Sequence, residues 1–316
     1  MKNKALMGYL SIAVAALIFS TQGIISSVLL SYDIEPLSLA FFKTFFGAIC
    51  LALMMVPLRR KDFQIRRHDL PRFVVYGIVG VALFSYFFFG AIEATNVTTA
   101  ITLMYTAPAF TVIFARFVLG EMVTLRKGAA IFLTLAGTLL VIVGYDTTAL
   151  AFHPRGFIMG ILVGVCYGVY NVLSKKYVQI YSVWTVNFYS VLFAAIFLGL
   201  LKNPVPLIMS GEIPPAGWLF VVLLSFLTYG VAYMFFIYGF RHVEAGRGSI
   251  IANIEPVGSV ILAAIFLKES MSLIQMAGFI LVVTSIFLAT REEPAVHDEQ
   301  VSDPLEKTLV YKNEVR

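Results

Sequence analysis

The sequence predicts an all-α polytopic membrane protein with ten transmembrane helices, arranged as two inverted five-helix repeats. Three observations predict this fold class. Of the 316 residues, 59% are hydrophobic and 13% are charged, whereas soluble domains are about 45–50% apolar and about 25% charged. Ten apolar runs follow one another between short polar breaks, and the second half of the chain repeats the first. This composition excludes an ordinary soluble enzyme, a disordered protein and a disulfide-stabilised secreted scaffold.

Each apolar run is long enough to cross the hydrocarbon core of a bilayer, which takes about 20 helical residues. Backbone groups in lipid must be satisfied within each segment, so the runs are expected to be helices. The first run follows two lysines as a signal peptide would, but it is longer than the apolar part of a signal peptide. In chain order, the expected spans are 5–30, 37–58, 73–95, 97–119, 128–145, 156–179, 183–201, 217–239, 248–267 and 273–290.

Lysine and arginine residues predict the orientation, because loops rich in them stay in the cytoplasm. With the N-terminus in the cytoplasm, 15 of the 23 Lys and Arg residues flank the spans on the cytoplasmic side and three flank them outside. The densest group lies in 59–72, between the second and third spans. Ten spans place both termini in the cytoplasm and the protein in the plasma (cytoplasmic) membrane. The net charge of +5 is therefore a topology signal rather than a nucleic-acid-binding surface.

A shift of 148 residues lays the second half of the chain on the first. Pro108 is matched by Pro256, and thirteen residues later Glu121 is matched by Glu269. Over the 36 positions that end at Glu121, eight are identical without a gap. Each repeat holds five spans, an odd number, so the second repeat enters the membrane upside down, as in many secondary transporters. The expected units are the repeats 1–145 and 146–290 and a disordered cytoplasmic tail, 291–316.

Two matching motifs carry a family resemblance. They are Tyr105-Thr106-Ala107-Pro108 followed by Leu119-Gly120-Glu121, and Asn253-Ile254-Glu255-Pro256 followed by Leu267-Lys268-Glu269. Together they resemble the paired EamA units of the drug/metabolite transporter superfamily, over roughly residues 5–290. The resemblance implies a ten-helix carrier with both termini in the cytoplasm, which agrees with the distribution of Lys and Arg. The superfamily includes exporters of amino acids and other metabolites, so the resemblance leaves the substrate open.

Two ionisable side chains within the spans are candidate functional groups, because such a residue costs about 2.5–3.5 kcal/mol at bilayer depth. Lys43 lies about 9 Å into its helix, so its ammonium group can contact a substrate carboxylate or reach the outer headgroups. Glu255 precedes Pro256, which removes a backbone hydrogen bond and loosens the helix. Its carboxyl can bind a substrate amine, carry a proton or serve as a protonated structural group. The repeat matches Glu255 with Ala107, and this asymmetry favours a functional role.

Polar and aromatic residues at similar depth are expected to line a cavity with aromatic walls. Tyr170 and Ser174 are four residues apart, as are Tyr229 and Tyr233, so each pair shares a helix face. For any single tyrosine, packing or a place in the interfacial belt is the plainer explanation. The candidate substrate-binding residues are Glu255, Lys43, Asn253, Tyr105, Asn171, Tyr170, Ser174, Tyr233 and Gln22, and the candidate helix-breaking residues are Pro108 and Pro256.

The expected function is secondary transport of a small organic metabolite across the cytoplasmic membrane by alternating access. The resemblance favours an amino acid or related compound as substrate, and export as direction. The sequence carries no ATP-binding motif, hydrolytic motif or metal-ligand spacing, so no cofactor is expected, and coupling to a proton or other ion, exchange and uncoupled transport stay open. The alternatives are a receptor or structural membrane protein, and a membrane-embedded enzyme. The expected partners are a small-molecule substrate and the lipid bilayer, not nucleic acid.

Overall fold

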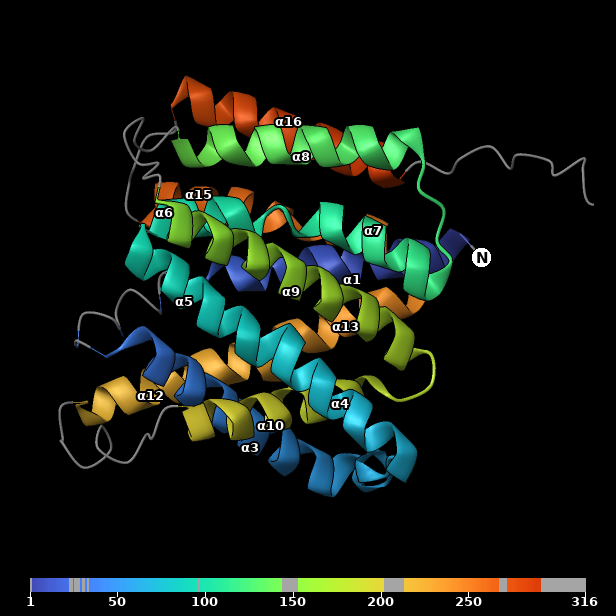
Figure 1. Ribbon diagram of the computed structural model, residues 1–316, viewed down its shortest axis with the longest axis vertical. Helices are drawn as coiled ribbons and strands as arrows, with labels where there is room; N and C mark the ends of the chain where they lie inside the picture. The colour runs from blue at the N-terminus through green and yellow to red at the C-terminus, as the bar shows by residue number, and fades with distance from the viewer. Residues whose placement is uncertain are drawn as a thin grey trace, which may run out of the picture.

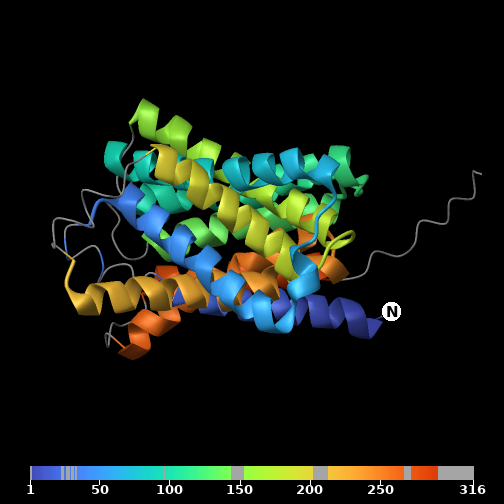
Figure 2. The same cartoon turned by 90° about the horizontal axis from the view of Figure 1, so that it is seen from below.

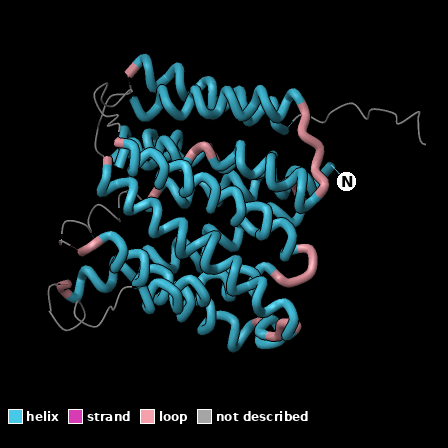
Figure 3. The backbone as a smooth tube through the Cα atoms, in the orientation of Figure 1, coloured by secondary structure: helices cyan, strands magenta, loops and turns pink. Residues whose placement is uncertain are grey.

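The computed structural model describes residues 2–22, 25, 29, 32, 34–95, 97–143, 153–201, 213–266 and 272–290. Within these residues all regular structure is helical and no strand occurs (Figure 3). Seven stretches are long and apolar enough to cross a membrane, and they are Pro36–Leu58, Arg67–Ala94, Thr99–Leu119, Pro154–Val178, Val183–Leu201, Pro215–His242 and Leu273–Thr290. A shorter apolar helix covers Lys4–Ser20. The chain is thus a polytopic helical membrane protein, while the tail 291–316 lies outside the described residues.

The helices run side by side with their axes roughly parallel (Figures 1 and 2). The first half contains α1 (Lys2–Ser20), α3 (Pro36–Leu58), η1 (Arg60–Phe63), η2 (Arg67–Asp69), α4 (Leu70–Gly77), η3 (Ile78–Leu83), α5 (Phe84–Ala94), α6 (Val97–Met104), α7 (Ala107–Leu119) and α8 (Leu125–Val143). The second half contains α9 (Pro154–Val178), α10 (Val183–Leu201), α12 (Pro215–Ser225), η4 (Phe226–Ala232), α13 (Tyr233–His242), α14 (Ala245–Ala252), α15 (Ile254–Phe266) and α16 (Leu273–Thr290).

Two helical stretches, α6–α7 and α14–α15, are each interrupted just before a proline. A proline lacks the N–H that would bond to the carbonyl four residues earlier, and its ring crowds that carbonyl. Met104, four residues before Pro108, is the last residue of α6, and Ala252, four residues before Pro256, is the last residue of α14. The breaks expose backbone groups in the middle of the bundle, where polar partners or a cavity are required.

Two other helical stretches, α4–α5 and α12–α13, each contain a wide π-helical turn in their middle. η3 joins α4 to α5, and η4 joins α12 to α13, each without leaving the helix axis. The two turns begin at Ile78 and Phe226, which are separated by the 148 residues of the sequence repeat. π-turns in helices often occur at functional sites, and both of these turns face the centre of the bundle through contacts with α9 and α1, respectively.

Helix contacts pair the two halves of the chain in a reciprocal way. α1 packs against α13 and α15 in the second half, and its counterpart α9 packs against α5 and α7 in the first half. α3 packs against α10, and α8 packs against α16, so that each of these helices contacts its own counterpart. Small residues allow the closest of these approaches: a Cβ atom on Gly137 would lie 2.8 Å from the carbonyl oxygen of Gly278. The halves therefore form one interlocked bundle.

The basic segments gather at one end of this bundle. Gln179, after α9, donates to the carbonyl of Arg241 near the end of α13. Gly8, near the start of α1, lies against Val243, just after α13. The segment 59–72 joins the same end, because the backbone N–H of Arg66 donates to the hydroxyl of a tyrosine in the α9–α10 turn. The start of α1 and the end of α16 also lie at this end (Figure 1), which we call the basic end.

Candidate functional site

Lys43 and Glu255 come from different halves of the chain and lie near each other. Lys43 lies on α3, and Glu255 lies in the first turn of α15, directly after the break between α14 and α15. The two side chains lie close enough for their charges to interact. Among the described residues no direct ion pair joins them.

An aromatic cluster connects these two charges. The ammonium nitrogen of Lys43 lies 5.8 Å from the ring centroid of Tyr229, a cation–π distance. The ring of Tyr229 stacks on that of Tyr233 at 5.2 Å, and Tyr233 meets Tyr170 edge-on at 5.3 Å. The charge of Glu255 also acts on Tyr233. Aromatic faces turned towards a partly desolvated site attract cationic groups such as an amine.

Two further tyrosines complete the surroundings of Glu255. Tyr105, in the break between α6 and α7, and Tyr167, on α9, both lie within reach of its charge. The backbone carbonyl of Glu255 accepts hydrogen bonds from Ser20 at 2.8 Å and Ser259 at 3.1 Å. The bond from Ser20 ties the first turn of α15 to α1.

Gln22 and Asn253 lie at the edge of this arrangement. The side-chain oxygen of Gln22 accepts a hydrogen bond of 3.0 Å from Thr228, a residue of η4. Asn253 is buried in the break between α14 and α15, and its amide nitrogen has no hydrogen-bond partner within the described part of the chain. A buried donor without a partner is costly, so this amide is suited to a water molecule or a polar ligand.

Asn171 and Ser174 instead bond to neighbouring helices. The amide nitrogen of Asn171 donates to the hydroxyl of Thr111 on α7 at 3.1 Å. The hydroxyl of Ser174 lies 2.7 Å from that of Tyr76 on α4, and Tyr76 stacks on Tyr170 at 5.1 Å. These contacts join α9 to the first half of the chain. The assignment of Asn171 and Ser174 to the substrate stays a prediction.

Sequence reasoning missed Tyr76 and Thr228. Each is a hydroxyl within a mostly apolar helical stretch, and buried hydroxyls of this kind usually find a partner. That requirement is the only signal in the sequence, and it does not identify the partner. The structure shows the partners to be Ser174 and Gln22.

A cluster of charged side chains joins the two halves of the chain at the basic end. The carboxylate of Glu121, after α7, accepts hydrogen bonds from the N–H groups of Ala245 at 2.7 Å and Gly246 at 3.2 Å, at the start of α14. An anion at a helix N-terminus is stabilised by the helix dipole. Lys127, which is only 3% exposed, lies 3.1 Å from Glu244 and 3.9 Å from Glu121. We call these groups, together with Arg247, which pairs with Glu244 at 2.7 Å, the junction cluster.

Among the described residues, no group of three or more His, Cys, Asp or Glu side chains is placed to hold a metal ion. The candidate site consists of one cation, one carboxyl, buried amides and aromatic rings, which are groups of the kind that orient small polar ligands.

Known proteins with similar sequences are transporters. An "uncharacterized transporter" of Archaeoglobus fulgidus is 28% identical over 280 residues, which cover 88% of this chain and 96% of that protein. An "S-adenosylmethionine uptake transporter" of Rickettsia conorii is 23% identical over 292 residues, which cover 91% and 94% of the two chains. A solved crystal structure superposes with a TM-score of 0.76 at 21% identity and covers 92% of this chain and 97% of its own, which shows a shared fold.

The two halves of the chain also match a family description separately. The model of the EamA-like transporter family matches residues 6–143 and again residues 154–291. The two matches start 148 residues apart, the offset found between the prolines of the broken helices and between the π-turns. The resemblance inferred from the sequence motifs is thereby confirmed, and this chain belongs to the EamA-like transporter family.

Proposed function

We propose that this protein is a secondary transporter that moves a small organic metabolite across the cytoplasmic membrane by alternating access. The observation that carries the proposal is the placement of Lys43 and Glu255 across an aromatic cluster, between the two halves of the chain. Charged residues in the membrane are costly, and where they occur they usually mark a ligand or proton site. The family points to transport rather than catalysis.

The substrate that best fits this site carries both an amine and a carboxylate. The ammonium group of Lys43 suits the carboxylate, while the carboxyl of Glu255 suits the amine. We therefore propose an amino acid or a compound derived from one. The printed name of the relative from Rickettsia conorii gives such a compound as its cargo, S-adenosylmethionine.

Export is the direction that we propose, following the exporters of the superfamily. The relative from Rickettsia conorii is named for uptake, so the direction depends on the gradients that drive each carrier and not on the fold alone. We propose that a proton carried by Glu255 is the coupling ion, because a buried carboxyl between two access routes can exchange a proton with either side.

Ten spans in two inverted five-helix units would provide the alternating access. Reciprocal helix contacts support this proposal, since α1 packs on α13 as α9 packs on α5. The opposite directions of α1 and α9 also support it, because α1 starts at the basic end whereas α9 ends there. The helices are loosened at Pro108 and Pro256, next to the candidate site. Such breaks are consistent with two units that move relative to each other. A structure of another state that relates the halves by an axis along the membrane normal would contradict this.

The first test identifies the substrate by ligand stabilisation. Purified protein is heated with amino acids, amines, nucleosides and sugars, and we expect a rise in melting temperature with one group of amino acids. A ligand at 100 times its dissociation constant stabilises the folded state by about 2.7 kcal/mol. The methyl ester and the N-acetyl form of the same amino acid are the controls, since each lacks one of the two charges. Equal stabilisation by these controls would contradict the paired-charge site.

The second test concerns orientation, with the basic end in the cytoplasm. Single cysteines are introduced at Arg66 and at Gln300 in a variant without Cys50 and Cys166. We expect neither to react with an impermeant thiol reagent in intact cells, and both to react after lysis, because Lys- and Arg-rich segments stay in the cytoplasm. A cysteine at Glu93, at the opposite end of α5, is the control that should react in intact cells. Labelling of position 66 or 300 before lysis would contradict the orientation.

A further inference from the structure

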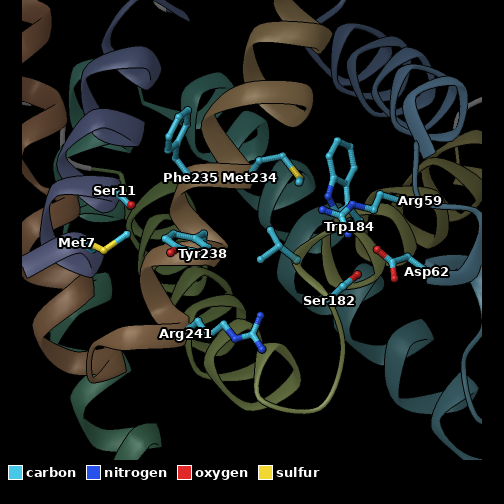
Figure 4. Close-up of a pocket in the computed structure, with 11 residues that line it drawn as sticks. Met7, Ser11, Arg59, Asp62, Ser182, Trp184, Met234, Phe235, Tyr238 and Arg241 are labelled. Carbon is cyan, nitrogen blue, oxygen red and sulfur yellow. The ribbon is translucent and has the colours of Figure 1, made fainter. Parts of the chain in front are cut away.

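A cavity lies at the basic end and is lined by neither of the two candidate charged residues. Its volume is about 580 Å³, within the range of about 300–1,000 Å³ that is usual for ligand pockets. Side chains of α1 and α13 form one wall, and the end of α3 with η1 and the start of α10 form the other (Figure 4). Neither Lys43 nor Glu255 lines it. The lining residues are Met7, Ser11, Arg59, Asp62, Ser182, Val183, Trp184, Met234, Phe235, Tyr238 and Arg241.

The lining changes from charged to apolar with depth. Arg241 lies at the end of α13, Tyr238 about one turn deeper, and Met234 about 10 Å deeper along the axis. Across the cavity, Arg59 follows the last residue of α3, and Trp184 lies in the first turn of α10. The guanidinium groups thus lie at the rim, Tyr and Trp lie deeper, and the apolar side chains lie deepest. Membrane proteins show the same order where they contact the headgroups, the interface and the acyl chains of a leaflet.

Two apolar side chains of the lining are partly exposed. Met7 on α1 is 51% exposed and Phe235 on α13 is 42% exposed. Phe235 belongs to the stretch Pro215–His242, which is long and apolar enough to cross a membrane, and Met7 belongs to the shorter apolar helix Lys4–Ser20. An apolar chain that enters the cavity can therefore lie against both of them.

The charges at the rim favour an anion. Neither guanidinium group, of Arg59 or of Arg241, has an ion-pair partner among the described residues. Asp62 offsets one of these two positive charges, which leaves the rim with a net charge of one positive unit. A headgroup with a single phosphodiester charge neutralises it, and guanidinium groups bind phosphate oxygens in a bidentate way.

We propose that this cavity binds an anionic phospholipid from the leaflet at the basic end. The phosphodiester lies between Arg59 and Arg241, and the indole N–H of Trp184 is available to its oxygens. One acyl chain follows Met7, Met234 and Phe235 into the bilayer. The bound lipid bridges α1 and α13 to α10, helices from both halves of the chain. This site is independent of the proposed transport substrate.

Trp184 supplies a direct probe of occupancy. The chain contains two tryptophans, and Trp218→Phe leaves Trp184 as the only one. The purified, delipidated variant is titrated in detergent with phosphatidylglycerol whose acyl chains are brominated, a quencher of tryptophan fluorescence. We expect saturable quenching at concentrations at least about tenfold lower than those of brominated phosphatidylcholine, because each basic residue adds to the attraction for anionic lipid.

Charge variants separate a built site from general attraction. Arg59→Gln/Arg241→Gln should lose the preference for phosphatidylglycerol. Arg60→Gln/Arg67→Gln removes the same amount of charge from exposed positions outside the cavity. This variant should keep the preference for phosphatidylglycerol. Ser11→Phe, which narrows the cavity without changing charge, should weaken quenching too and serves if the double variant does not fold.

Three outcomes would overturn the proposal. Equal quenching by the two brominated lipids would mean contact with bulk lipid only. Relief of quenching by millimolar inorganic phosphate, to the same extent in all variants, would indicate a site for free anions. Equal losses in the cavity variant and the exposed-charge variant would indicate a diffuse electrostatic effect.

Discussion

Replacement of Glu255 by glutamine is expected to lower transport in proteoliposomes by about ten- to a hundredfold while the protein stays folded. Glutamine keeps the size of the side chain but cannot carry the negative charge that faces Lys43 and the tyrosines. A charged hydrogen bond to a substrate amine contributes about 1.5–3 kcal/mol, which corresponds to this loss of rate. Initial rates of uptake of the identified substrate, measured at several pH values, provide the test.

The pH profile and a matched control separate the roles of Glu255. If the carboxyl also carries the coupling proton, Glu255→Gln should abolish uptake driven by a proton gradient but retain exchange of substrate across the membrane. Glu93→Gln alters an exposed carboxyl at the end of α5 and should leave both unchanged. Wild-type rates with an unchanged pH profile in Glu255→Gln would remove this residue from the mechanism and leave the aromatic cluster as the remaining candidate.

Replacement of Lys127 by methionine is expected to lower the free energy of unfolding by about 3–5 kcal/mol, the cost of removing one partner from a buried ion pair. Lys127 is nearly inaccessible, and its ammonium group also donates to the carbonyl of Met122 at 2.7 Å. Without it, the carboxylates of Glu121 and Glu244 lose their shared cation. Unfolding titrations in mixed micelles measure the loss.

Two comparisons test that explanation. Lys176→Met removes an exposed lysine at the end of α9 and should change stability by less than about 0.5 kcal/mol. A second variant, Lys127→Met with Glu121→Gln and Glu244→Gln, removes the repulsion and should recover part of the loss. No difference between the Lys127 and Lys176 variants would show that the junction cluster does not hold the two halves together at the basic end.

The sequence predicts most helices of this protein well, because their ends are set by local chemistry. The expected spans 183–201 and 273–290 coincide with α10 and α16, since polar breaks bound each apolar run. The number of spans and their inversion stay predictions. The π-turn that begins at Ile78 could not be predicted from an unbroken apolar run, because it depends on how closely α9 and α10 pack. Gly80 touches Tyr170 there, and a Cβ atom on Gly77 would lie 2.7 Å from a carbonyl of α10.

The candidate site residues can be selected one by one from the sequence, but their arrangement cannot. Lys43 and Glu255 stand out because charges in lipid are rare, yet nothing local indicates that residues 212 positions apart lie together. Hydroxyl and amide groups give a weaker signal, since a buried Ser or Asn can serve a ligand or a neighbouring helix equally well. Ser174 and Asn171 bond to Tyr76 and Thr111 in the structure, contacts that only the tertiary fold decides.

The matching π-turns bear on the ancestry of the chain. A π-turn holds one more residue than an α-turn, so gaining or losing one in only one half would shift that half by a residue. The turns at Ile78 and Phe226 keep the offset that also separates the two family matches. A wide turn at the same place in both halves is what descent from one ancestral unit predicts. Other members of the family should then carry a matching pair of wide turns at the same offset.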